Sequence, residues 1–265
     1  MVENNPTDLV LISGLINIHK WGKNFLHTIT NLWGSNNVYI IYTNSETKVK
    51  QNYFNGKIVY SIGANNYRSG ADSVEKQALE VEKKVRILQE KHHLGEHFHI
   101  IAHSMGGLVA RQYIFNNPNT VTNLVTLGTP NYGSPLAVFY KWLSFLIGAR
   151  KAFENLTPGW TKEFNTRCPI HRAPLWNNGK IYTIRGYTTR NPLNNFGVIG
   201  EVLFAWLTLR LIYKTKSDGL VPENSVLAEG AVHLADFPTY NHLDLVRQSS
   251  VAEKASSVLL DLKSH

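Results

Sequence analysis

The residues best suited to do chemistry are in Ala102-His103-Ser104-Met105-Gly106-Gly107, where small residues flank a serine. A short apolar run leads into Ser104, and a helical pattern follows it. In a tight turn from strand to helix, the side chains two positions before and after the serine must be small, and Ala102 and Gly106 meet that requirement. This pattern is the G-x-S-x-G nucleophile elbow with Ala in place of the first Gly, and it predicts a nucleophilic Ser104. The alternative is an ordinary helix start.

A nucleophilic serine needs an acid and a base, and in folds with this turn they follow the serine in that order. Asp218 is the best placed acid, because Ser217-Asp218-Gly219-Leu220-Val221-Pro222 presents its carboxylate on a tight loop. Glu223 follows a proline in a polar stretch, and Asp236 lies inside a predicted strand, 231–237. We therefore predict Asp218 as the acid, with Glu223 and Asp236 as its rivals.

The base is predicted from the position of the histidines relative to the last strand. His242 follows that strand and precedes the last predicted helix, where the general base of such folds lies, whereas His233 falls within the strand. His103 is expected to be a packed structural residue whose side chain points away from Ser104. Four further histidines could suggest a metal, but no carboxylate or cysteine pattern completes a ligand set, so a solvated helix end and a strand explain them better: His92, His93, His97 and His99.

An acyl-transfer site also needs backbone N–H groups that bind a developing oxyanion. One of them follows the nucleophile, which makes it the N–H of Met105. The other is expected in the loop after the first core strand, Ser13-Gly14-Leu15-Ile16-Asn17. Gly14 permits a sharp turn there, and Leu15 then supplies the second N–H.

These residues must be positioned by a sheet, and the chain contains short apolar runs rich in β-branched and aromatic residues. Runs that are apolar on both faces are typical of a parallel sheet covered by helices. A two-residue Asn55-Gly56 turn between further strand-like segments predicts an added hairpin. The predicted core strands are 9–12, 38–42, 98–102, 121–127 and 181–187.

Helical patterns alternate with these strands. Apolar residues recur at three- and four-residue steps from Val74 to Leu88, a second helix runs from Met105 to Asn116, and a third spans about 243–262. Alternating strands and helices predict a mostly parallel, doubly wound α/β sheet. With no repeats and no low-complexity linker, we predict a single domain over residues 1–265.

Two intervals, 134–178 and 191–214, depart from this rhythm because large apolar and aromatic residues crowd into them. One interpretation is that both simply add core. The other is a pair of lid insertions whose inner faces cover an apolar acyl-binding cleft, and whose opening exposes a surface for transient contact with lipid.

Composition limits the partners. The 265 residues include 27 Lys+Arg and 19 Asp+Glu, a formal net charge of +8, but the basic residues are scattered and nucleic-acid binding is not expected. A hydrophobic content of 43% excludes wholesale disorder, and the single Cys168 excludes an intramolecular disulfide.

No apolar run reaches the roughly 18 residues of a membrane span, and no signal peptide is visible in this chain. We expect secretion rather than a cytoplasmic location, by a route that the sequence leaves open.

Together the motifs resemble those of the bacterial true lipases of the pseudomonad type, which have the α/β-hydrolase fold. The resemblance implies hydrolysis of carboxylic esters of acylglycerols through an acyl-enzyme, with no cofactor for catalysis. One departure is Ser13-Gly14, where the family usually has His-Gly. The matching segments are 102–107, 126–134, 154–158 with 163–165, 217–221 and 241–244.

The resemblance also implies a structural calcium site near the catalytic His. Matching positions hold Asp244, Gln248 and the carbonyl of Ala252, with Asn194 as the upstream ligand. Asn194 is neutral where the family has a carboxylate, which should weaken a site whose affinity depends on ligand charge. The alternative is that Asp244 simply caps the last helix.

Three classes of function stay open. A triacylglycerol lipase would act on long-chain, emulsified esters. A short-chain carboxylesterase or a thioesterase would use Ser104, Asp218 and His242 on smaller or sulfur-linked substrates. A catalytically silent binding protein of the same fold would normally lack one of these three residues, and all three are present.

Overall fold

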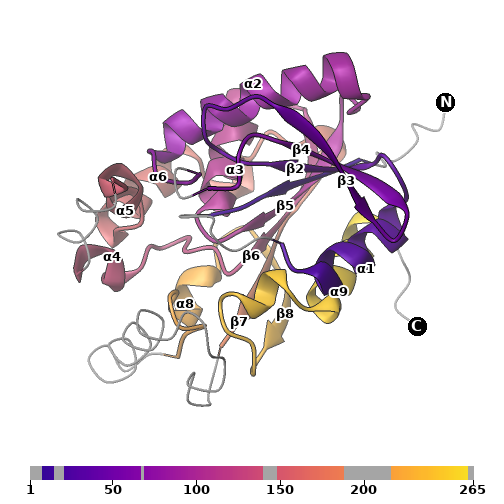
Figure 1. Ribbon diagram of the computed structural model, residues 1–265. Coiled ribbons are helices and arrows are strands. Elements are labelled where there is room, and N and C mark those ends of the chain that lie inside the picture. The colour runs from indigo at the N-terminus through magenta and orange to yellow at the C-terminus, as the bar shows by residue number, and fades with distance from the viewer. Residues whose placement is uncertain (1–7, 15–20, 67–68, 140–147, 188–215, 262–265) are drawn as a thin grey trace.

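The computed structural model describes residues 8–14, 21–66, 69–139, 148–187 and 216–261 (Figure 1). Its centre is an eight-stranded sheet of order β3-β4-β2-β1-β5-β6-β7-β8. Every neighbouring pair is parallel except the β3–β4 hairpin. The strands are β1 (Leu9–Ile12), β2 (Val38–Ile41), β3 (Val49–Phe54), β4 (Lys57–Ile62), β5 (Phe98–His103), β6 (Val121–Leu127), β7 (Ile181–Gly186) and β8 (Val232–Phe237).

The central strands are buried on both faces, as their apolar runs predict. All residues of β1, β2 and β5 are buried. Parallel strands need crossover connections, and the connecting helices cover the two faces of the sheet. The carboxyl ends of β1, β5, β6, β7 and β8 therefore share one edge, and the segments that follow them carry the predicted site.

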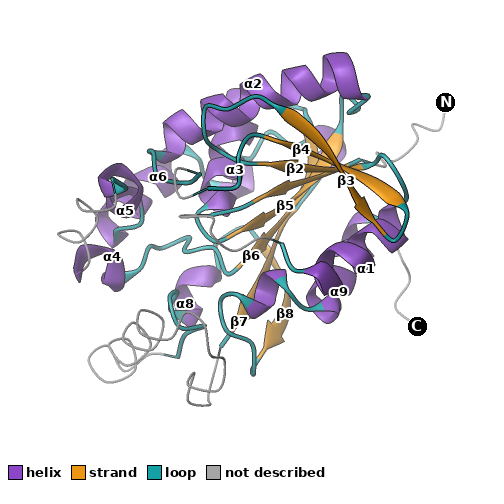
Figure 2. Ribbon diagram, viewed as in Figure 1, coloured by secondary structure: helices purple, strands orange, loops and turns teal. Residues whose placement is uncertain are grey.

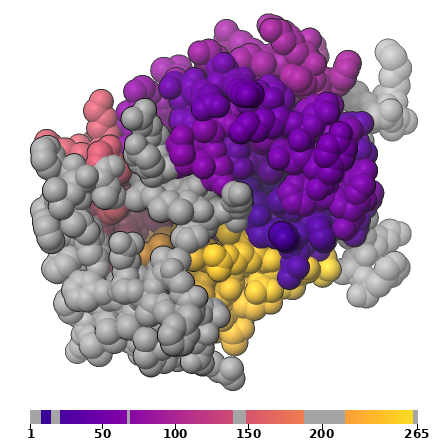
Figure 3. All heavy atoms as spheres, in the orientation of Figure 1, coloured from indigo at the N-terminus to yellow at the C-terminus, as the bar shows by residue number. Residues whose placement is uncertain are grey.

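Helices α2 (Val74–His92) and α3 (Gly106–Asn116) pack in one apolar core, and α1 (Lys23–Trp33) and α9 (Ser249–Leu259) pack in a second core on the other face (Figure 2). Ser73 is the N-cap of helix α2, and its hydroxyl accepts the Lys76 N–H. Helices α1 and α9, far apart in the sequence, lie side by side, where Trp33 Nε1 donates to Ser256 Oγ at 3.1 Å. Figure 3 shows the early and late parts of the chain against each other. The doubly wound α/β class is thus confirmed.

The last helix differs from the expected continuous span over 243–262. A separate 3₁₀ turn, η6 (Asp244–Val246), precedes α9, and Gln248 between them is extended, with φ −92° and ψ 137°. A reciprocal pair of hydrogen bonds lies at the start of the 3₁₀ turn. Asn241 Oδ1 accepts the Asp244 N–H at 3.0 Å, and Asp244 Oδ2 accepts the Asn241 N–H at 2.9 Å, as in a capping box. Asp244 therefore caps this turn and not α9.

The described part of the interval 134–178 packs partly into the core. It holds α4 (Pro135–Phe139), α5 (Arg150–Asn155), α6 (Pro158–Arg167) and two 3₁₀ turns, η2 (Ile170–Arg172) and η3 (Trp176–Asn178). Phe164 is fully buried and stacks on Trp160, with centroids 4.9 Å apart, while the Arg111 guanidinium lies 4.9 Å from its ring. The interpretation that this interval adds core holds for Phe164. The interval 191–214 lies outside the described residues.

One ammonium group is buried between α2 and the end of β2. Lys84 is fully buried, and its Nζ donates to the carbonyls of Tyr42 and Asn44. Burial lowers the pKa of Lys84 to about 8, because desolvation disfavours the charged form.

Among the described residues, no helix is both long and apolar enough to cross a membrane.

Candidate active site

Ser104 lies at the turn from β5 to α3, in a backbone conformation that few non-glycine residues adopt. Its φ is +55°. Such conformations persist only where the surroundings impose them. Here the Ser104 N–H donates to the Leu127 carbonyl at 2.9 Å, and the Thr129 hydroxyl donates to the Ser104 carbonyl at 2.8 Å. The elbow expected from the sequence is therefore present, held by β6 and the segment that follows it.

The two glycines after the elbow are required by close backbone contacts. A Cβ at Gly106 would lie 2.8 Å from the carbonyl oxygens of Ile12 and Ser13, and one at Gly107 would lie 2.2 Å from Thr129 Oγ1. Real Cβ atoms do not approach other atoms so closely, so a side chain at either position would push α3 away from β1 or from Thr129. Glycine is thus required at 106 and 107 by the close approach of α3 to the end of β1 and to Thr129, which is a different steric reason from the one that the sequence indicates.

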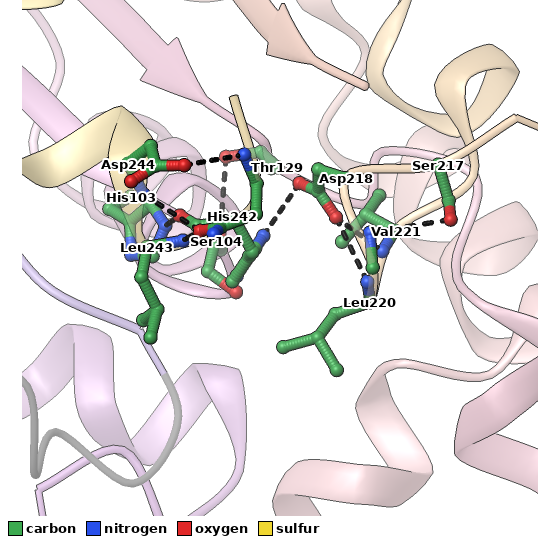
Figure 4. A network of polar contacts seen from close by, with 12 residues as sticks. His103, Ser104, Thr129, Ser217, Asp218, Leu220, Val221, His242, Leu243 and Asp244 are labelled. Carbon is green, nitrogen blue, oxygen red and sulfur yellow. Dashed lines mark hydrogen bonds and ion pairs between the residues drawn. The ribbon is translucent and has the colours of Figure 1, made fainter. Parts of the chain in front are cut away.

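The structure brings the predicted acid and base together. His242 Nδ1 lies 2.7 Å from Asp218 Oδ2, and the His242 N–H donates to the Asp218 carbonyl at 2.8 Å (Figure 4). Asp218 is fully buried and His242 is 4% exposed. Asp218 Oδ1 accepts the N–H groups of Leu220 at 3.0 Å and Val221 at 2.8 Å. Both carboxylate oxygens are thus satisfied, which a buried charge requires.

The rival residues are engaged elsewhere. The Asp236 carboxylate pairs with Arg185 and accepts a hydrogen bond from His233 Nε2 at 2.8 Å. The hydrogen bond from Arg185 holds the pKa of Asp236 below its usual range, with His233 contributing less. Glu223 begins the short helix α8 (Glu223–Val226), where its carboxylate lies 4.0 Å from Arg185.

His103 lies directly before Ser104, the predicted nucleophile, and against His242, the predicted base. Its Nε2 is 2.9 Å from the His242 carbonyl oxygen, and the two ring centroids are 4.4 Å apart. His103 is therefore a packed residue, as the sequence predicts, and it contacts the predicted base. Within the described residues, the Ser104 hydroxyl makes no hydrogen bond of its own. Catalytic hydrogen bonds of this kind often tighten only with substrate in place.

Of the two predicted oxyanion donors, Met105 is described and Leu15 lies outside the described residues. The Met105 N–H lies at the N-terminal end of α3. A Cβ at Gly14 would lie 3.0 Å from Met105 N and 2.7 Å from Ser104 Cβ. Gly14 therefore leaves open the space beside the Met105 N–H and the Ser104 side chain. This is where an oxyanion formed by attack of Ser104 would have to be bound.

Of the calcium ligands that the resemblance implies, Asp244, Gln248 and Ala252 lie within the described residues. One carboxylate oxygen of Asp244 is taken by the Asn241 N–H. Ala252 is fully buried within α9, where backbone carbonyls accept bonds from the helix itself. Asn194 lies outside the described residues. Among the described residues, no group of three or more His, Cys, Asp or Glu could hold a metal ion, and calcium stays a prediction.

Sequence reasoning missed two contributors to this site. Thr129 holds the Ser104 carbonyl, and a Cβ at Gly128 (φ +55°) would lie 3.0 Å from Asp218 Oδ2 and 3.3 Å from His242 Nδ1. Both belong to Thr126-Leu127-Gly128-Thr129-Pro130, which the sequence indicates only as part of a resemblance. Their roles depend on contacts between residues far apart in the chain.

The fold and this edge of the sheet define an α/β-hydrolase. The structure is similar to mature Bacillus licheniformis lipase BlEst2, with a TM-score of 0.67 and 19% identity over 98% of this chain and 95% of that one. It is also similar to lipase 1 of Pelosinus fermentans, with a TM-score of 0.60 and 11% identity over 98% and 100% of the two chains. At these identities the likeness is one of fold.

A sequence profile of the palmitoyl protein thioesterase family matches residues 9–166, more than half of the chain. The chain belongs to this family. No protein with a curated description matches it. Family and fold support a hydrolase of ester-type bonds. This is the general class of enzyme that the sequence predicts. The narrower resemblance to pseudomonad-type lipases, and the roles of individual residues, are matters of proposal.

Proposed function

We propose that the protein is a serine hydrolase that cleaves long-chain acyl esters through an acyl-enzyme, with acylglycerols as the leading substrate class. The observation that carries the proposal is the buried pair of Asp218 and His242, joined at 2.7 Å, near a Ser104 held at φ +55°. A carboxylate, an imidazole and an elbow serine form the machinery of acyl transfer. The resemblance to pseudomonad-type lipases supports the choice of acylglycerols.

In this proposal, Ser104 Oγ attacks the acyl carbonyl while His242 Nε2 takes the hydroxyl proton. Asp218 keeps the other ring nitrogen protonated and stabilises the imidazolium. The N–H groups of Met105 and Leu15 bind the oxyanion until the bond to the leaving oxygen breaks and His242 protonates that oxygen. Water, deprotonated by His242, then attacks the acyl carbon. The bond from that carbon to Ser104 Oγ breaks, His242 returns the proton to Oγ, and a fatty acid is released.

A second candidate is a long-chain acyl thioesterase. The family match over residues 9–166 favours it, since that family is named for cleavage of palmitoyl thioesters. The same residues would serve, because only the leaving atom changes from oxygen to sulfur.

We further propose that the intervals 134–178 and 191–214 act as lids, with Val138 on α4, 58% exposed, among the residues that touch lipid. We also propose that the protein is secreted, as expected from the sequence.

The test is a chain-length profile with p-nitrophenyl acetate through palmitate, beside a palmitoyl thioester of equal chain length. We expect hydrolysis that increases with acyl length and is abolished in Ser104→Ala, together with labelling of the wild-type serine by a fluorophosphonate. Undiminished turnover in Ser104→Ala would refute the assignment. A preference for acetate would favour the short-chain carboxylesterase, and faster turnover of the thioester would favour the thioesterase.

A further inference from the structure

The predicted base is held through its backbone as well as through its ring. The His242 carbonyl accepts a hydrogen bond from His103 Nε2 at 2.9 Å. A carbonyl oxygen has no proton to give, so Nε2 of His103 must carry the hydrogen. The His242 N–H in turn donates to the Asp218 carbonyl at 2.8 Å. Both backbone polar groups of His242 are therefore occupied, one by the acid and one by the residue next to the nucleophile.

The contact between the two histidines is enclosed. The rings are 4.4 Å apart between centroids and tilted by 45°, and the residues are 7% and 4% exposed. His103 is the last residue of β5, directly before Ser104, whereas His242 lies on the segment between β8 and η6. The hydrogen bond thus ties the loop that carries the base to the strand that carries the nucleophile. Its donor is one residue before Ser104, and its acceptor is the backbone carbonyl of His242 itself.

We propose that His103 is a positioning residue that fixes His242 relative to Ser104, an inference that rests on the proposed function. The Asp218–His242 bond orients the imidazole toward the acid but does not set its distance from Ser104, because Asp218 and His242 are on neighbouring loops. His103 supplies that second constraint. Positioning matters because a displacement of about 1 Å at a reacting group can cost on the order of a hundredfold in rate.

The experiment compares two variants that separate the ring from the hydrogen bond. His103→Phe keeps an aromatic ring against His242 but has no donor, whereas His103→Gln loses the ring and places a side-chain N–H at about the same reach. We expect His103→Phe to lower kcat for p-nitrophenyl butyrate about tenfold to a hundredfold with KM changed less than about twofold. It should also slow labelling of Ser104 by a fluorophosphonate. His103→Gln should recover much of both rates.

The matched control is His99→Phe, a buried histidine (2% exposed) on the same strand but at its other end, against Trp33. It should lower the melting temperature about as much as His103→Phe while leaving kcat near the wild-type value. The inference is overturned if His103→Phe keeps wild-type kcat, if His99→Phe loses as much, or if His103→Gln is no better than His103→Phe. Activity retained in Ser104→Ala would instead refute the proposed function itself.

Discussion

Replacing Asp218 by Asn should inactivate the protein for a reason that the structure defines atom by atom. Asp218 Oδ1 accepts two backbone N–H groups, from Leu220 and Val221, so an amide in its place must keep its oxygen there. The NH₂ group then faces His242 Nδ1, 2.7 Å from the present Oδ2. Because an NH₂ donates, Nδ1 must accept, and the ring proton moves to Nε2. The nitrogen that should take the Ser104 proton no longer has a free lone pair.

The expected loss is about 10⁴-fold in kcat, the size seen for the same change in a serine protease triad, or about 5 kcal/mol of transition-state stabilisation. The assay is kcat with p-nitrophenyl butyrate together with the melting temperature, which should move little because volume and the two N–H bonds are kept. Glu223→Gln and Asp236→Asn are the controls, and both should stay within about threefold of the wild type. An Asp218→Asn protein within tenfold of the wild type, or an equal loss in either control, would refute this reasoning.

Three further outcomes test other parts of the structure. Gly14→Ala should lower kcat by about 10²–10³, because its Cβ would lie 3.0 Å from Met105 N, and a fully active variant would show that this space is not used. From about pH 8 to 10.5 the folded protein leaves Lys84 neutral while the unfolded chain keeps its proton, so the free energy of unfolding should gain a contribution that rises with pH. Lys84→Met should lack that contribution in urea titrations over this range. A chelator should lower the melting temperature of the calcium-treated protein, and Asp244→Ala should remove that sensitivity. An unchanged melting temperature would mean that no ion is bound.

The parts of the fold that were predictable are those in which local pattern and final environment agree. Strand β6 has the bounds that its apolar run predicts, 121–127, because a strand buried on both faces needs apolar residues at every position. The Asn55-Gly56 turn pairs Phe54 with Lys57, and its two residues have φ of 51° and 74°. Positive φ at both positions is what a two-residue hairpin of this kind requires.

Other elements were missed although their pattern was present. Helix α1 buries four apolar residues on one face. The first two are adjacent, and the others follow at steps of three and four positions: Phe25, Leu26, Ile29 and Trp33. Short polar residues between them weaken the pattern. The split between η6 and α9 was missed because helical periodicity continues across Gln248, while the capping pair that starts a new turn involves only Asn241 and Asp244.

The identities of the predicted catalytic residues follow from short motifs, but their supports do not. The hydrogen bonds from Thr129 to the Ser104 carbonyl and from His103 to the His242 carbonyl join residues 25 and 139 positions apart. Both end on backbone atoms, which every residue has, so no residue type at the receiving end marks them. They depend on the register of β5 against β6 and on where the chain returns after β8, and these follow only from the assembled sheet.

One short segment explains how residues from three distant motifs reach a common geometry. Thr129 holds the carbonyl of Ser104, the predicted nucleophile, and Ser134 Oγ donates to the Leu220 carbonyl at 3.0 Å, on the turn that presents Asp218, the predicted acid. Gly128 lies against both Asp218 and His242, where any side chain would separate them from β6. The segment between β6 and α4 therefore contacts all three sides of the site. A substitution there should disturb the placement of the predicted nucleophile, acid and base relative to one another. Thr129→Val should therefore lower kcat by more than its effect on the melting temperature would suggest. An unchanged kcat would contradict this role.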